Sequence, residues 1–329
     1  PGWKLYASEV PHTLQTRGVY RTMSHYRDWA RDDKPLPPGG ILQTPDLAAP
    51  EVFEGFDPNY RSSYDNAYVR INCRNSWKKT SKHDFLAGEF RWSGFDYLGE
   101  ALAWPRRSWN FGIIDLCGFP KDSYYFYQSR WTAAPMVHIL PHWTWPGKEG
   151  KAIPVVAYSN CEEVELLLDG KSLGRKTMDG AMDLTWLVPY EPGTLKAVAY
   201  RGGKPLAEKQ YVTAGPAAGV RLSCDRAAIA ADGRDVVHVT VEIVDAAGNP
   251  VPHADNRVRF ELSGPGRIIG VDNGDPLDLE PTKADNRKAF FGMCLAIVQS
   301  TGQAGTIRIV AASSGLAGDG AQISAIRKP

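Results

Sequence analysis

The chain has 329 residues, with 38 Lys and Arg against 37 Asp and Glu spread along it. This balance argues against nucleic acid or a membrane surface as a partner, and no apolar run approaches the ~18 residues of a membrane span. Five widely spaced cysteines include no C-x-x-C pair, so we expect no zinc site. The sequence also has no glycine loop of the kind that holds phosphate, and we expect no cofactor.

Two apolar runs in the first part of the chain, residues 3–9 and 85–92, are expected to be strands. The first ends in Glu9 and the second in Trp92. Catalytic groups of a (β/α)8 barrel project from the carboxyl ends of its strands, and Glu9 fits that placement. The alternative for Glu9 is a surface or helix N-terminal glutamate. Trp92 could stack its indole on the apolar face of a sugar ring, and the alternative is a core tryptophan.

Three further polar residues are candidates for sugar binding. Asp96 and Glu100 follow the second run and could accept hydrogen bonds from sugar hydroxyls. Their alternative is exposure to solvent or a bond to backbone amides. Tyr64 lies in the polar segment 61–66 and could point into a pocket, whereas the segment as a whole could simply cap a helix.

Helices are expected in two places in this part of the chain. One should cover 64–79, with Ser63 or Asp65 as its cap, and another should begin near Asp122, capped by Asp122 or Ser123. Nine of the ten tryptophans precede residue 149. Aromatic crowding of this kind is typical of an active-site region carried on long loops.

Two other features concern buried polar groups. Glu89 lies inside the second run, where a buried carboxylate needs a partner, and Arg17 and Arg91 are candidates. His138 and His142 are four residues apart, but a proline lies between them in an extended stretch. A zinc pair usually lies on one helix face, so we expect no metal there.

From about residue 151 the pattern changes to short strands separated by turns, which favours small antiparallel sandwiches. An Asp169-Gly170 pair predicts a hairpin, and residues 214–219 are a linker candidate. The expected strands include 153–159, 163–168, 194–200, 236–244, 257–263 and 305–312.

Taken together, these segments resemble the C-terminal half of glycoside hydrolase family 2, the β-galactosidase type. The likeness covers nearly all of the chain in collinear order, which is more specific than any single motif. The matching stretches are 7–9, 16–20, 62–66, 88–100, 111–122, 135–143, 158–166 and 270–276.

The resemblance implies a multidomain α/β and all-β fold. Residues 1–148 would be the C-terminal part of a (β/α)8 TIM barrel, strands 7 and 8. Residues 149–214 and 215–329 would be Ig-like β-sandwiches. Glu9 would end the seventh strand as the nucleophile, and Trp92 would end the eighth and line the subsite of the cleaved sugar.

The resemblance also implies a function. It predicts a retaining, exo-acting enzyme that hydrolyses terminal β-galactosides, with a β-galactoside oligosaccharide or glycan as its partner. The family's general acid lies on an Asn-Glu pair after the fourth strand, and this chain contains no such pair. We therefore expect an incomplete fragment, inactive by itself. Residues 10–12 and 102–105 depart from the family pattern.

Other interpretations remain open at this point. The enzyme could be a β-glucuronidase or another β-glycosidase of the same family. The chain could instead be a carbohydrate-binding or structural sandwich module without catalysis. A periplasmic or extracellular bacterial location is favoured over a cytoplasmic one, and nothing in the sequence specifies an oligomeric state.

Overall fold

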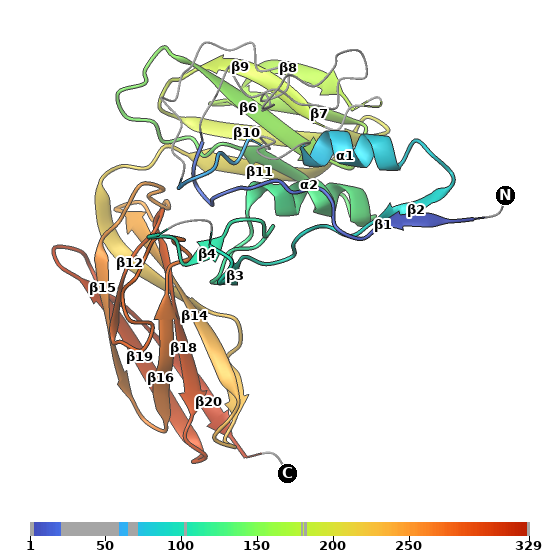
Figure 1. Cartoon of the computed structure of the whole chain (residues 1–329). Coiled ribbons are helices and arrows are strands. Elements are labelled where there is room, and N and C mark those ends of the chain that lie inside the picture. The colour runs from blue at the N-terminus through green and yellow to red at the C-terminus, as the bar shows by residue number, and fades with distance from the viewer. Residues whose placement is uncertain are drawn as a thin grey trace. The chain divides into compact units, whose positions relative to one another are not determined.

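The computed structural model describes residues 3–20, 59–64, 72–101, 104–178, 180 and 183–327. The chain divides into two compact units, Pro1–Thr213 and Ala214–Pro329, called unit 1 and unit 2 below. Figure 1 shows the elements of both units. No helix among the described residues is long and apolar enough to cross a membrane.

The first strands of unit 1 form a parallel pair. Strand β1 (Leu5–Ala7) pairs with β2 (Leu86–Glu89), and helix α1 (Cys73–Thr80) precedes β2 in the chain. Within the described residues no other strand joins this pair, so the expected part of a TIM barrel is not evident. A barrel closes only when every strand has a neighbour on both sides, which β1 and β2 do not provide by themselves.

Helix α1 does not start at its predicted cap. The Oδ1 atom of Asn72 accepts a hydrogen bond from the Asn75 amide at 2.8 Å and caps the helix. Ser63 instead donates its hydroxyl to the Thr16 carbonyl at 2.8 Å. Asp65, the other predicted cap, lies outside the described residues.

Helix α2 (Asp122–Trp131) begins where a helix was predicted, but without a side-chain cap. Its N-cap residue is Lys121, and Asp122 lies in the first turn. The Asp122 carboxylate accepts a hydrogen bond from the Tyr20 hydroxyl at 2.9 Å and lies 2.7 Å from His138. The Asp122 carboxylate, which was predicted to cap the helix, therefore bonds to residues from other segments instead.

The rest of unit 1 is a β-sandwich. One sheet has the order β5-β6-β9 and the other β11-β10-β7-β8, while β3 and β4 form a short separate hairpin. These strands are β3 (Tyr97–Leu98), β4 (Ser108–Trp109), β5 (Val137–Leu140), β6 (Ala152–Ser159), β7 (Glu163–Leu168), β8 (Lys171–Thr177), β9 (Leu184–Pro189), β10 (Thr194–Arg201) and β11 (Lys204–Val212).

The sandwich and the preceding segment share one hydrophobic core. Phe126 and Tyr127 of α2 belong to the same buried cluster as Trp143 and the inward residues of β6 and β10. Strand β5, which lies before the expected boundary at residue 148, pairs with β6. Helix α2, which also lies before that boundary, thus packs on the sandwich (Figure 1).

The predicted hairpin at residues 169–170 is confirmed. It joins β7 to β8, and both Asp169 and Gly170 have positive φ, 50° and 78°. This is the backbone conformation that a tight two-residue hairpin requires, and Asp and Gly adopt it more readily than most residues.

Unit 2 is a second sandwich, with sheet orders β12-β14-β18-β16 and β13-β20-β19-β15-β17. The alternation in β14 places Val237, Val239 and Val241 in the core. Strands predicted at 236–244, 257–263 and 305–312 are confirmed to within one residue. The strands are β12 (Ala217–Cys224), β13 (Ala228–Ala230), β14 (Val236–Asp245), β15 (Arg257–Ser263), β16 (Gly266–Asp272), β17 (Asn286–Lys288), β18 (Met293–Ser300), β19 (Gly305–Ser313) and β20 (Asp319–Ile326).

Candidate functional site

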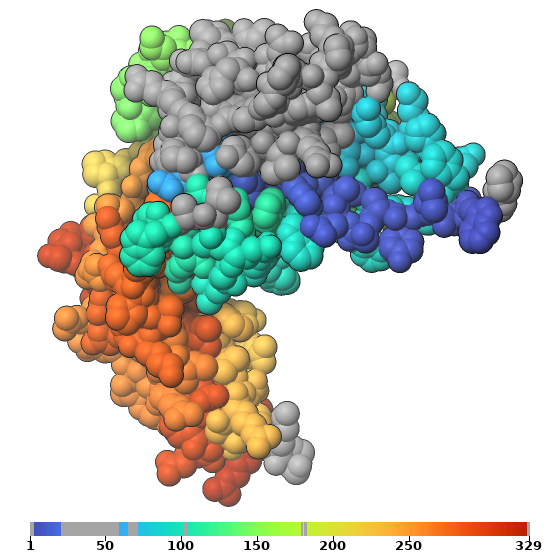
Figure 2. Space-filling view, in the orientation of Figure 1, coloured from blue at the N-terminus to red at the C-terminus, as the bar shows by residue number. Residues whose placement is uncertain are grey.

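Glu9 and Trp92 follow the carboxyl ends of the parallel strands β1 and β2. Beyond the strands the two segments stay joined, because the Val10 amide donates to the Phe90 carbonyl at 3.0 Å. The Glu9 side chain is 51% exposed, and its Oε1 atom lies 3.0 Å from Nε2 of His12. Figure 2 shows the N-terminal segment, in blue, at the surface of unit 1. A carboxylate and an indole thus emerge at the same edge of the parallel pair.

Tyr97 connects Trp92 with Glu100. The Trp92 indole N–H donates to the Tyr97 hydroxyl at 3.3 Å, and that hydroxyl donates to Oε2 of Glu100 at 2.7 Å. Partial burial and then the bond to Glu100 raise the pKa of Tyr97 to about 12, and the charge of Glu9 contributes in the same direction. Tyr97 therefore links Trp92 to Glu100 through its hydroxyl group.

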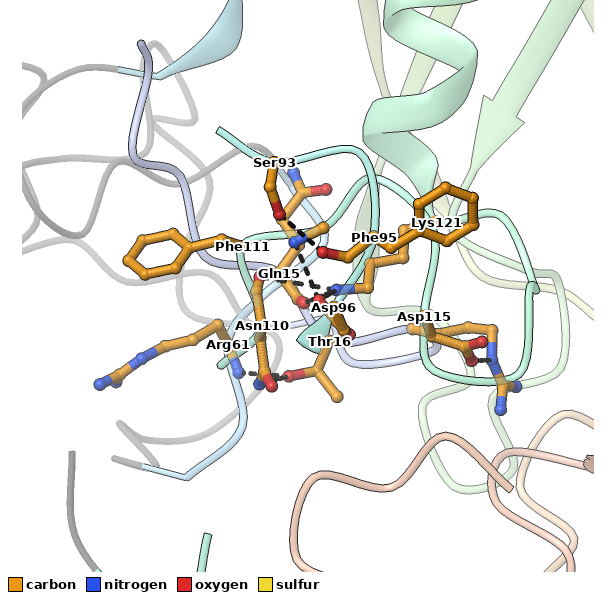
Figure 3. A network of polar contacts seen from close by, with 12 residues as sticks. Gln15, Thr16, Arg61, Ser93, Phe95, Asp96, Asn110, Phe111, Asp115 and Lys121 are labelled. Atoms are coloured by element: carbon orange, nitrogen blue, oxygen red, sulfur yellow. Dashed lines mark hydrogen bonds and ion pairs between the residues drawn. The ribbon is translucent and has the colours of Figure 1, made fainter. Parts of the chain in front are cut away.

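Asp96 does not join this group. Only 7% exposed, it accepts hydrogen bonds through Oδ1 from the Lys121 ammonium at 2.7 Å and the Gly112 amide at 2.8 Å. Burial raises the pKa of Asp96 to about 6, and the Lys121 charge opposes that rise. Burial likewise lowers the pKa of Lys121. The predicted sugar ligand is thus one half of an internal ion pair (Figure 3).

The Asp96–Lys121 pair holds several segments together. The Lys121 ammonium also donates to the Gln15 carbonyl at 2.7 Å, and Asn110 donates its amide to the Thr16 hydroxyl at 2.8 Å. Figure 3 shows the side chains of Asp96, Lys121 and Asn110 converging on the segment around Gln15. The segment that follows Glu9 is therefore anchored to the loop that follows Trp92.

Tyr64 is also buried. Only 2% of it is exposed, and its hydroxyl donates to the Pro154 carbonyl of β6 at 2.7 Å. Burial raises its pKa well above the usual range of a tyrosine. Of the five predicted site residues, Trp92 and Glu100 share Tyr97 as a partner and Glu9 leaves the same edge of the strand pair, while Asp96 and Tyr64 lie in the interior.

Sequence reasoning missed two residues of this group, His12 and Tyr97. His12 lies three residues after Glu9, in the stretch that departs from the family pattern. Tyr97 lies between Asp96 and Glu100 in a matching stretch. Spacing could not have placed His12 beside Glu9, because residues 9–12 form no helix, and the bonds of Tyr97 depend on how the β3–β4 hairpin folds back.

Glu89 is bound by hydroxyls, not by the predicted arginines. Its Oε2 atom accepts hydrogen bonds from Ser76 at 2.8 Å and Thr80 at 2.7 Å, both on α1. Burial raises the pKa of Glu89, and the two hydroxyls and the charge of Arg91 oppose the rise. Arg17 pairs with Asp115 at 2.7 Å instead. Glu89 therefore joins α1 to β2.

The histidine pair does not converge. His138 bonds to Asp122, and the ring of His142 stacks on Trp145 with centroids 4.1 Å apart. Among the residues that the structure describes, no group of three or more His, Cys, Asp or Glu side chains is placed to hold a metal ion.

Gly112 is needed for the close approach of two backbone segments. A Cβ atom there would overlap the backbone of Phe95 and Asp96 and lie 2.5 Å from the Ile114 carbonyl oxygen. We expect Gly112→Ala to destabilise unit 1 by about 1–3 kcal/mol, because backbone must move to admit the methyl group. Urea unfolding followed by tryptophan fluorescence measures this, since all ten tryptophans lie in unit 1.

The matched control is Gly94→Ala. A Cβ atom at Gly94 meets nothing within 4 Å, so its effect should stay within about 0.5 kcal/mol. Equal effects of the two substitutions would contradict the close approach at Gly112.

Comparison with known proteins identifies the family. Residues 220–322 match the family model "Glycoside hydrolase family 2 C-terminal domain 5", and residues 150–207 match a domain of unknown function, DUF4982. The β-galactosidase BoGH2A of Bacteroides ovatus is 47% identical over 263 residues, which are 78% of this chain and 30% of that protein. The chain belongs to glycoside hydrolase family 2.

Two further proteins are similar to most of this family 2 chain. A putative β-glucuronidase of Formosa agariphila is 41% identical over 305 residues, 87% of this chain and 29% of that protein. The crystal structure of a β-glycosidase from Bacteroides vulgatus superposes with a TM-score of 0.87 at 43% identity, covering 97% of this chain and 41% of the other. The chain thus spans about a third of the length of the curated relatives that it matches.

Proposed function

We propose that this chain supplies the nucleophile side of the active site of a retaining, exo-acting β-galactosidase, as part of a longer protein. The observation that carries the proposal is the common edge of β1 and β2, because the segments that carry Glu9 and Trp92 both leave the paired strands there. The likeness to a β-galactosidase at 47% identity supports the choice of sugar.

The exposed apolar side chains of the parallel pair support a larger barrel around it. Trp3, Leu5 and Tyr6 are 79%, 55% and 66% exposed, and Phe90 is 63% exposed. Large apolar side chains gathered on one short strand pair mark a surface that packs against other protein. In the proposal, further strands of a (β/α)8 barrel cover them and bring the general acid to the site.

In this proposal the reaction has the two steps of a retaining glycosidase. A carboxylic acid outside these residues protonates the glycosidic oxygen, and Glu9 attacks the anomeric carbon from the opposite face. The bond from the anomeric carbon to the glycosidic oxygen breaks, the leaving group departs as an alcohol with that proton, and a covalent glycosyl-enzyme forms. Water that loses its proton to the same outside carboxylate then breaks the ester bond to Glu9 and releases the sugar with retained configuration. Trp92 offers its indole as an apolar wall for the ring, while Tyr97 and Glu100 offer oxygen atoms to the sugar hydroxyls.

A mechanism-based label tests this proposal. A 2-deoxy-2-fluoro-β-galactoside with a good leaving group should inactivate a full-length protein that carries this chain, and the label should be recovered on the peptide containing Glu9. Recovery of the label on another carboxylate would overturn the assignment. Failure to turn over any aryl β-glycoside would overturn the proposed function itself.

A β-glucuronidase is the second candidate, favoured by the 41% identity with a putative β-glucuronidase over 87% of the chain. The ratio of kcat/KM for nitrophenyl β-galactoside and β-glucuronide separates the two. A purely sugar-binding module gains no support from Trp186, because this tryptophan of the first sandwich is only 5% exposed.

A further inference from the structure

Arg91 has an unusual set of partners for a half-buried arginine. Its Nη1 atom donates to the carbonyl oxygens of Pro11 and Trp92. Its Nη2 atom donates to the carbonyls of Thr13 at 2.8 Å and Phe111 at 2.9 Å. Within the described residues no carboxylate lies within ion-pair distance of its guanidinium. The hydrogen bonds of Arg91 therefore go to backbone oxygens.

The four carbonyls belong to the segments that carry the candidate site. Pro11 and Thr13 follow Glu9 within four residues, and the Trp92 carbonyl belongs to the proposed sugar-binding residue itself. Phe111 lies on the chain that returns from the β3–β4 hairpin, next to Gly112. One planar cation thus bridges the backbone beyond β1, the backbone beyond β2 and the segment that follows β4.

We propose that Arg91 is a positioning residue that fixes the Glu9 segment against Trp92, and this rests on the proposed function. The guanidinium group is a rigid planar fork with five donors, so it bonds several oxygens at fixed angles. A lysine ammonium has three donors around one atom and cannot span the same four oxygens. Without the guanidinium, the segment after Glu9 and the segment around Trp92 lose the bonds that hold them at a fixed distance from each other.

The expected effect on catalysis is large because the geometry of attack is strict. A displacement of about 1 Å in a reacting group can lower the rate on the order of 10²-fold. Arg91→Met in the full-length protein should therefore lower kcat/KM for an aryl β-galactoside by about 10- to 100-fold, measured well below the melting temperature. The rate of fluoroglycoside labelling at Glu9 should fall in parallel, and Arg91→Lys should lie between Met and wild type.

Arg130→Met is the matched control. Arg130 also donates to a backbone carbonyl, that of Ser159 at 2.6 Å, but it joins α2 to β6 away from the candidate site. This variant should lower the melting temperature and leave kcat/KM of the folded enzyme unchanged. A purely structural role for Arg91 would make both variants behave alike, and that result would overturn the proposal. So would an Arg91→Met enzyme whose kcat/KM stays within twofold of wild type.

Hydrogen–deuterium exchange keeps this test separate from the proposed function. In Arg91→Met, amides of residues 9–17 and 92–98 should exchange at least about 10-fold faster, whereas those of α2 should not change. If the wild type hydrolyses no aryl glycoside, the proposed function fails while exchange still tests Arg91. If Arg91→Met does not fold, Arg91→Lys provides both readouts, and unchanged exchange in that variant would reject the positioning role.

Discussion

Lys121→Met is expected to destabilise unit 1 by about 3–5 kcal/mol, because it leaves the Asp96 carboxylate buried without its cation. The two side chains are only 1% and 4% exposed, and their charged atoms lie 2.7 Å apart. The substitution also removes the donor to the Gln15 carbonyl. Urea unfolding monitored by tryptophan fluorescence should show the loss, since every tryptophan lies in unit 1.

Two further variants test whether the unpaired charge of Asp96 causes the loss of stability in Lys121→Met. The double variant Asp96→Asn with Lys121→Met removes both charges and keeps an oxygen for the Gly112 amide, so it should be more stable than Lys121→Met alone. Lys82→Met removes an exposed lysine and should change stability by no more than about 0.5 kcal/mol. A double variant no more stable than the single one would show that the ion pair is not the origin of the effect.

Glu9→Gln in the full-length protein should lower kcat/KM for a nitrophenyl β-galactoside by at least about 10³-fold, as the removal of an attacking group does in other enzymes. The amide keeps the size of the side chain beside His12, but it cannot form the glycosyl ester. Stability should change little because the Glu9 side chain is half exposed. Initial rates at several substrate concentrations measure the loss.

Glu100→Gln provides the contrast for Glu9. Glu100 accepts a hydrogen bond from Tyr97 and is proposed to bind rather than to attack, so its substitution should act mainly on KM.

A Glu9→Gly variant supplied with azide should recover turnover of an activated substrate, because a small anion can attack from the vacated position. Activity of Glu9→Gln within tenfold of wild type would contradict the role of Glu9 as nucleophile.

Local patterns in the sequence were sufficient for most of the strands. Alternation along 236–244 marks one face of β14 as core, and the Asp169-Gly170 pair marks a hairpin, since both signals depend only on neighbouring residues. The start of α2 was also predicted closely, although its cap was not. These features are local, so no knowledge of distant partners was needed.

Local sequence also pointed to the two ends of the candidate site. The runs that end near Glu9 and Trp92 do form strands, and their parallel pairing places both residues at one edge. Which polar neighbours reach that edge could not be predicted in this way. Asp96 and Glu100 are four residues apart and were predicted to have the same role in sugar binding, yet Asp96 is buried and Glu100 is exposed.

The sequence by itself determined the positions of most strands, the family resemblance and the choice of Glu9 as the candidate nucleophile. Only the tertiary structure decided that Asp96 pairs with Lys121, 25 residues away, and that Arg91 turns to four backbone carbonyls rather than to Glu89. The physical reason is that a buried charge must be paired or hydrogen-bonded, and its partner can come from any segment that the fold brings near.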